Sequence, residues 1–162
     1  MISTDVQTAL GLLPVQQRVR VIMRGAAGSR GQVVQFDLAR GNAATTSALV
    51  AESTSSLVNV AAPTAAGIKY GLCAVLESDV AQNGKAWAIV RGRVYALCKK
   101  TSGSITYGDP LQMEASGTAL QATLAANARV VAISLGTATT PTTATLVEVL
   151  FNGIEGVSTY TG

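Results

Sequence analysis

Residues 87–153 constrain the fold most, because they consist of short apolar stretches in a two-residue period, separated by tight turns. Successive side chains of a β-strand point to opposite faces, so this period predicts strands and not helices. The expected strands span residues 86–98, 110–114, 118–123, 129–135 and 145–151. Many short strands separated by turn residues predict an all-β fold, a small β-barrel or sandwich.

The amino-terminal part of the chain has a different pattern. Residues 3–13 have the apolar spacing of one short helix. Residues 17–24 alternate arginine with apolar side chains, which predicts a strand or an extended arm with a basic side. That basic side consists of Arg18, Arg20 and Arg24. Residues 41–66 are rich in Ala, Thr and Ser, which favours irregular or weakly stranded structure.

The length of 162 residues predicts one domain with an appended arm. A chain of this size buries roughly 68–70% of its unfolded surface, so it forms a core without disulfide bonds. The expected parts are an extended N-terminal arm over residues 1–30, an irregular or weakly stranded excursion packed on the core over 31–66, and a β-barrel core over 67–162.

The composition bears on possible partners. Charged residues make up only 13% of the chain, against about 25% in typical proteins. Either a partner covers part of this charge-poor surface, or the protein is a soluble monomer whose surface consists of Thr, Ser and Gln. The net charge of +3 is too small to argue for direct nucleic-acid binding, which depends on the number of phosphates neutralised. No apolar run reaches the roughly 18 residues of a membrane-spanning helix, and the amino terminus does not resemble a signal peptide.

Residues that carry chemistry are scarce. The chain has no histidine, which excludes Ser-His-Asp and Cys-His nucleophiles and every histidine-bearing metal site. We expect Cys73 and Cys98 to be small buried hydrophobic residues, with a disulfide as the minor alternative. Asp109 follows a glycine and precedes a proline, so it is expected to shape a turn through hydrogen bonds to its own backbone. These observations predict no enzyme, no metal site and no cofactor.

Two strands carry side chains suited to contacts with another protein. In the strand over 86–98, one row of side chains combines aromatic, apolar and basic residues, a composition that fits an interface at least as well as a core. The row consists of Trp87, Ile89, Arg91, Arg93 and Tyr95. In the last strand, Glu148 lies between two leucines on a face expected to be covered. It either pairs with one of Arg129, Arg91 and Arg93, or reaches the sheet edge and is solvated.

Several segments between residues 67 and 153 also resemble a known family. They are Gly-Leu-Cys-Ala-Val-Leu at 71–76, Gly-Arg-Val at 92–94, Tyr-Gly-Asp-Pro-Leu at 107–111, Gly-Thr-Ala-Leu at 117–120, Val-Val-Ala-Ile-Ser-Leu at 130–135 and the strand from 145 to 153. In this order they resemble the decoration, or cement, proteins on the capsids of tailed bacteriophages and cyanophages.

The resemblance implies a small β-barrel of the β-clip or β-tulip type, a homotrimer, that binds the major capsid protein on the outer surface of the virion and stabilises contacts between capsid subunits. Such a protein is made in the host cytoplasm and touches neither membrane nor nucleic acid directly. The residues expected to contact the capsid or a neighbouring subunit are Arg18, Arg20, Arg24, Trp87, Arg91, Arg93 and Glu148.

Three alternatives stay open. The first is another virion structural component, such as a head fibre base, a head–tail completion protein or a tail protein. The second is a carbohydrate-binding module, which needs exposed aromatic side chains in a cleft, and the third is an enzyme. The chain holds one Trp, four Tyr and two Phe, which disfavours the carbohydrate module.

Overall fold

The computed structural model describes residues 16–36, 57–63, 72–114, 117, 119–125, 128–139 and 141–159. This part of the chain is all-β, as the sequence predicts, and its strands form one large sheet. The helix expected over 3–13 lies outside the described residues. No helix in the described part has the length and apolar character needed to cross a membrane.

Ten strands are present among these residues. They are β1 (Gln17–Met23), β2 (Val33–Phe36), β3 (Val58–Ala61), β4 (Cys73–Leu76), β5 (Lys85–Lys99), β6 (Pro110–Met113), β7 (Leu120–Gln121), β8 (Arg129–Ser134), β9 (Thr145–Asn152) and β10 (Ser158–Thr159). The strands expected over residues 86–151 are all found; the one expected over 118–123 is limited to the two residues of β7.

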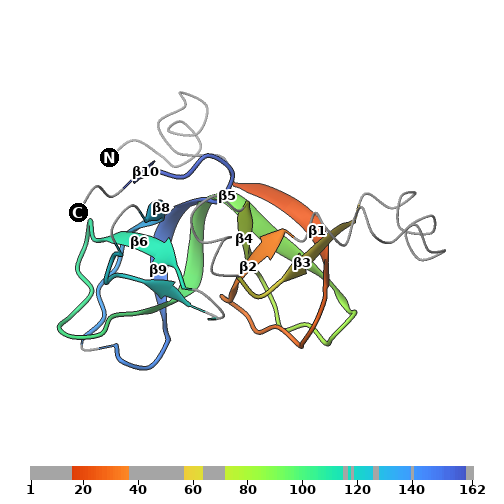
Figure 1. The fold of residues 1–162 in the computed structure, drawn as a ribbon, viewed down its shortest axis with the longest axis horizontal. Coiled ribbons are helices and arrows are strands. Elements are labelled where there is room, and N and C mark those ends of the chain that lie inside the picture. The colour runs from red at the N-terminus through yellow and green to blue at the C-terminus, as the bar shows by residue number, and fades with distance from the viewer. Residues whose placement is uncertain are drawn as a thin grey trace, which may run out of the picture.

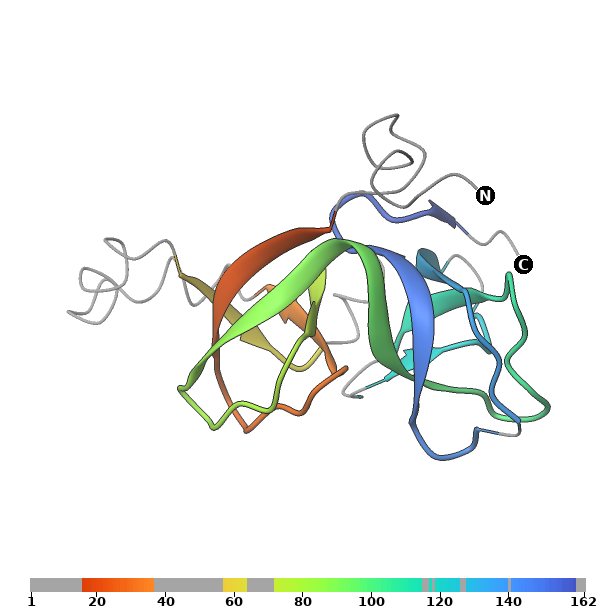
Figure 2. The same cartoon turned by 180° about the vertical axis from the view of Figure 1, so that it is seen from behind.

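The strand pairings form two closed rings that share β5. In the first ring β1 pairs with β3, β3 with β2, β2 with β4, β4 with β5, and β5 with β1. In the second ring β5 pairs with β9, β9 with β8, β8 with β6, β6 with β7, and β7 with β5. Figures 1 and 2 show these two groups of strands side by side, with β5 passing through both. The short strand β10 adds to β8.

β1 is an integral strand of the first ring, whereas residues 1–15 of the expected arm lie outside the described residues. Its residues pair antiparallel with β5 from Gln17 to Ile22, and its second edge pairs in parallel with β3. Val21 and Met23 are fully buried in the core of this ring. One backbone edge of β1 is therefore paired with β5 along most of its length, and its last three residues are also paired with β3, so this strand is not a free arm.

The region expected as an excursion over 31–66 also contributes to this ring through β2 and β3. β3 lies between β1 and β2, so these strands close the first ring; residues 37–56 and 64–66 of the expected excursion lie outside the described residues.

The middle of β5 contains a glycine that the local geometry requires. Gly92 has φ +117°, a conformation that L side chains rarely adopt, and a Cβ there would lie 2.9 Å from the Cα of Gln16. It separates the half of β5 that pairs with β1 and β4 from the half that pairs with β9. Glycine thus allows one strand to serve two rings.

The core has two parts, and β4 borders both of them. Ala74 and Leu76 pack in the core of the first ring, whereas Cys73 and Val75 pack in that of the second. Because successive side chains of a strand point to opposite faces, one short strand supplies both cores, and all four of its residues are buried. Burial of both faces of β4 holds the two rings against each other.

A candidate protein-interaction surface

On the first ring, the exposed side chain of Trp87 of β5 lies beside two arginines of β1. Arg20 of β1 lies directly opposite Trp87 in the strand register, and Arg18 is two residues before it on the same face. The guanidinium carbons of Arg18 and Arg20 lie 5.8 and 5.7 Å from the centre of the indole ring. These distances are those of cation–π contacts, although Trp87 is 47% exposed. The sequence placed these three residues on two separate strands, and the register brings them together.

Glu77, which follows β4, continues this cluster. Arg18 donates two hydrogen bonds to its carboxylate, from Nε to Oε2 at 3.0 Å and from Nη2 to Oε1 at 2.7 Å. The hydrogen bond to Glu77, with its negative charge, raises the pKa of Arg18 above the usual value. The backbone N–H of Glu77 also donates to the carbonyl oxygen of Trp87 at 3.0 Å. We call Arg18, Arg20, Glu77 and Trp87 the tryptophan strip.

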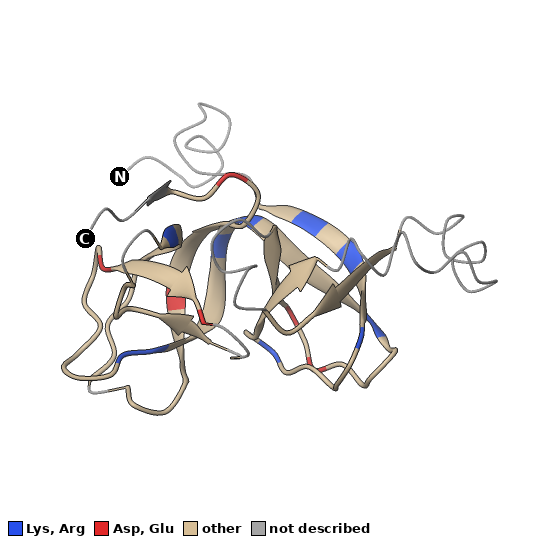
Figure 3. Cartoon of the chain, in the orientation of Figure 1, with Lys and Arg blue, Asp and Glu red and all other residues tan. Residues whose placement is uncertain are grey.

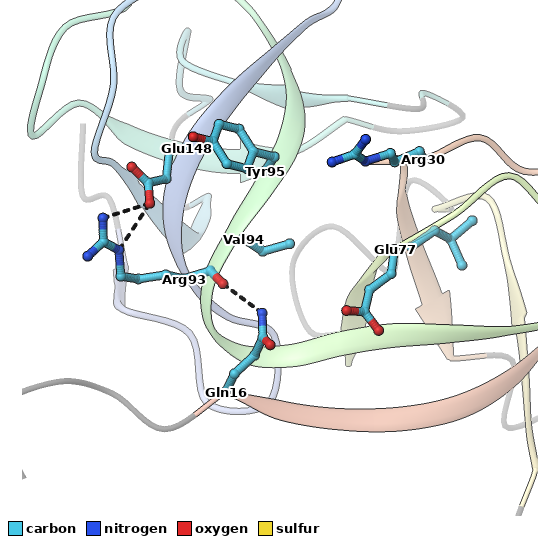
Figure 4. Close-up of a pocket in the computed structure, with 8 residues that line it drawn as sticks. Gln16, Arg30, Glu77, Arg93, Val94, Tyr95 and Glu148 are labelled. Carbon is cyan, nitrogen blue, oxygen red and sulfur yellow. Dashed lines mark hydrogen bonds and ion pairs between the residues drawn. The ribbon is translucent and has the colours of Figure 1, made fainter. Parts of the chain in front are cut away.

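A groove of about 200 Å³ lies between the two rings and shares Glu77 with the tryptophan strip. Figure 4 shows its polar lining, with the side-chain amide of Gln16 donating to the carbonyl oxygen of Arg93 at 2.9 Å. Local sequence patterns did not reveal this groove, because its walls come from segments far apart in the chain. The polar side chains that line it are Gln16, Arg30, Glu77, Arg93, Tyr95 and Glu148.

Glu148 lies at this groove and pairs with Arg93, one of the three partners expected for it. Arg93 donates from Nε at 3.1 Å and from Nη2 at 2.7 Å, both to Oε1 of Glu148. The two side chains are 51% and 27% exposed, so the ion pair is neither buried nor simply solvated. Leu146, on the same face of β9, is 42% exposed. Within the described part of the chain, this face of β9 is therefore only partly covered.

The other expected contact residues lie in different surroundings. Arg91 is 4.0 Å from Glu155, and Arg129 donates a hydrogen bond to the carbonyl oxygen of Ile154. Arg24 donates to the side-chain oxygens of Asn59 at 2.9 Å and Asn83 at 3.0 Å, beyond the end of β1. The structure therefore joins Arg18, Arg20 and Trp87, and separately joins Arg93 and Glu148. Arg24 instead binds Asn59 of β3 and Asn83 of the turn before β5.

The residues considered for chemistry occupy structural positions. Both cysteines are free and buried, and this burial raises the pKa of each thiol to about 12. Lys100 donates to the carbonyl oxygen of Ser104 and to Asp109 Oδ2, so it is bound within a loop. Within the described ranges, no group of three or more His, Cys, Asp or Glu residues is arranged to hold a metal ion.

Asp109 shapes its turn, as expected. Its carboxylate accepts hydrogen bonds from the backbone N–H and the hydroxyl of Thr106, both at 3.1 Å, and from Lys100. Partial burial opposes ionisation, but these hydrogen bonds and the Lys100 charge together lower the pKa of Asp109. The turn holds Tyr107, which is 74% exposed, at its tip.

The arrangement suits contact with a protein. Exposed Trp, Tyr and Arg side chains are the residue types enriched where binding energy concentrates in interfaces. Trp87, Arg18 and Arg20 lie on the paired strands β5 and β1, so their backbone loses little conformational freedom on binding. Known protein-family models give no match to this sequence, and a search of curated proteins finds no similar sequence.

Proposed function

We propose that this protein is a capsid decoration, or cement, protein of a tailed bacteriophage. It binds the outer surface of the assembled head, contacts the major capsid protein and stabilises the contacts between capsid subunits. The observation that carries the proposal is the tryptophan strip, an exposed aromatic and arginine cluster on a rigid sheet. The family resemblance of residues 67–153 supports the same assignment.

In the proposed mechanism the protein stabilises the shell by binding to it and catalyses no reaction. A protein that binds the assembled shell but not free capsid subunits stabilises the shell by mass action. The stabilisation from many bound copies, each with a modest affinity, adds over the whole particle. The tryptophan strip supplies an aromatic anchor with flanking cations, and the groove beside it accepts polar groups of the neighbouring subunit.

We further propose that each ring of strands forms a small barrel of the β-clip or β-tulip type and that the protein assembles as a homotrimer. Closed pairing in both rings leaves few free strand edges, which suits a protein that must stay soluble before it reaches the capsid. In this arrangement side-chain contacts make the interfaces, in place of strand addition through β1.

Electron cryo-microscopy of purified virions, with and without this protein, tests the function. We expect density for the protein on the outer head surface, in hundreds of copies per particle, and earlier release of DNA on heating when it is absent. A few copies confined to one vertex would instead support a head–tail completion or tail component. Absence from purified particles would overturn a virion role altogether.

A further inference from the structure

We propose that Arg20, held against Trp87, is the cation that binds a carboxylate on an acidic protein surface. This inference depends on the proposed function, since it specifies the chemistry of the partner at the tryptophan strip. It also separates the arginines of this region into two roles. Arg20 binds the partner, whereas Arg18 and Arg93 are already paired with carboxylates of the chain.

The ion pairs within the chain support this separation. Arg18 is neutralised by Glu77 and Arg93 by Glu148, each through two hydrogen bonds. Arg20 has no carboxylate within ion-pair distance among the described residues, and its contact there is the indole ring of Trp87. Lys85, two residues before Trp87 on β5, is likewise exposed and lacks an ion pair in the described part of the chain. Blue bands along β1 mark the basic residues of this strand in Figure 3.

The position of Arg20 favours binding of a carboxylate. Its backbone pairs with Trp87 in the register of β1 against β5, and its guanidinium lies 5.7 Å from the centre of the Trp87 ring. Stacking on the indole restricts the side chain before the partner arrives, so less entropy is lost on binding. The planar guanidinium presents parallel N–H groups that match the two oxygens of a carboxylate. Trp87 provides apolar surface next to the guanidinium of Arg20.

The charges around the strip favour a protein partner over nucleic acid. Glu77 and Glu148 at the groove are each paired with an arginine, so these pairs offer no net positive charge to a run of phosphates. Binding to nucleic acid needs many uncompensated cations, whereas the strip and the groove have few: Arg20, Lys85 and, at the groove, Arg30. A single exposed Trp also provides no stacking platform for successive bases. One or two carboxylates next to an apolar patch match the strip better.

The fluorescence of Trp87, the one tryptophan in the sequence, reports directly on this site. We would titrate the full chain with poly-L-glutamate at low salt, and with a DNA duplex at the same charge concentration. We expect saturable quenching by poly-L-glutamate that weakens as salt is added. For Arg20→Gln, we expect binding about fivefold weaker, the effect of one exposed ion pair.

Lys99→Gln is the matched control, because it removes one positive charge from the other end of β5, where Lys99 pairs with Glu114. We expect it to bind poly-L-glutamate like the wild type. Equal losses for Lys99→Gln and Arg20→Gln would show a general charge effect and overturn the proposal. Tighter binding of the duplex than of poly-L-glutamate would overturn it in favour of nucleic acid. Circular dichroism and thermal unfolding of each variant confirm that it is folded.

Co-sedimentation with stripped virus particles distinguishes this inference from the proposed function. If the wild-type protein decorates particles and Arg20→Gln decorates them equally well, the role of Arg20 is wrong while the function stands. If the wild-type protein does not bind particles but shows the Arg20-dependent response to poly-L-glutamate, the carboxylate site stands and the capsid function fails.

Discussion

Arg93 of β5 and Glu148 of β9 form a diagonal pair across two antiparallel strands, with both hydrogen bonds ending on the same carboxylate oxygen. The residues directly opposite them in the register are Leu150 and Tyr95, so the arginine reaches along the sheet to meet the acid. This pair joins the strand shared by both rings to a strand of the second ring alone.

The partial exposure of this pair predicts a small contribution to stability. In a double-mutant cycle of Arg93→Met and Glu148→Gln, we expect a coupling free energy of about 0.2–1 kcal/mol, as for other exposed ion pairs. Chemical denaturation of the four proteins measures it. A coupling above about 2 kcal/mol would mean that the pair is buried, for example in a subunit contact.

Gly92 is predicted to be much less tolerant of substitution than Gly103. Both have positive φ, but a Cβ at Gly92 would lie 2.9 Å from the Cα of Gln16, whereas Gly103 has open space around it. We expect Gly103→Ala to cost about 1–2 kcal/mol of unfolding free energy from backbone strain, and Gly92→Ala to cost about 2–4 kcal/mol from strain plus overpacking. Urea denaturation compares them, and equal losses would contradict a steric role for Gly92.

Asp109 is predicted to make the protein sensitive to acid. Its pKa in the folded state is lowered, so its stabilising effect is present above the ordinary pKa of 3.8 and is lost as the pH falls through the folded-state value. Asp109→Asn should therefore be less stable than the wild type at neutral pH, and the difference should shrink in acid. Thermal unfolding from pH 2 to pH 7 measures both proteins; a difference independent of pH would contradict the prediction.

The two cysteines are predicted to be unreactive in the folded protein. With the pKa of each thiol raised to about 12 by burial, almost no thiolate is present at pH 8. Labelling by iodoacetamide should be slow in native buffer and fast in denaturant, where both thiols react. Rapid labelling of either Cys73 or Cys98 in native buffer would show that this part of the core opens readily.

Two truncations distinguish the contribution of β1 to folding from that of the residues before it. Removal of residues 1–24 deletes β1 with Val21 and Met23, so we expect loss of cooperative unfolding. Removal of residues 1–15 leaves β1 intact and should preserve the fold as judged by circular dichroism. A folded protein lacking residues 1–24 would contradict the role of β1 in closing the first ring.

The sequence alone predicted one apolar row in each of β1 and β5. The alternation of arginine with apolar residues in β1 and the apolar row of Ala88, Val90, Val94 and Ala96 in β5 follow this pattern; Ala88, Val90 and Ala96 are buried and Val94 is partly buried. The burial of both cysteines and the turn at Asp109 were also predicted. These properties follow from local geometry, because strand faces alternate and a short polar side chain bonds to its own backbone.

Only the tertiary structure decided which strands meet. The sequence offered Arg129, Arg91 and Arg93 as partners for Glu148, and the register of β5 against β9 selected Arg93. It did not predict the contact of Arg18 with Glu77, which are 59 residues apart. From its sequence alone, a basic strand can be an arm or part of a sheet. The pairing of β1 with β3 and β5 makes it part of the sheet, because the burial of its side chains and its strand pairing outweigh the conformational entropy of a free arm.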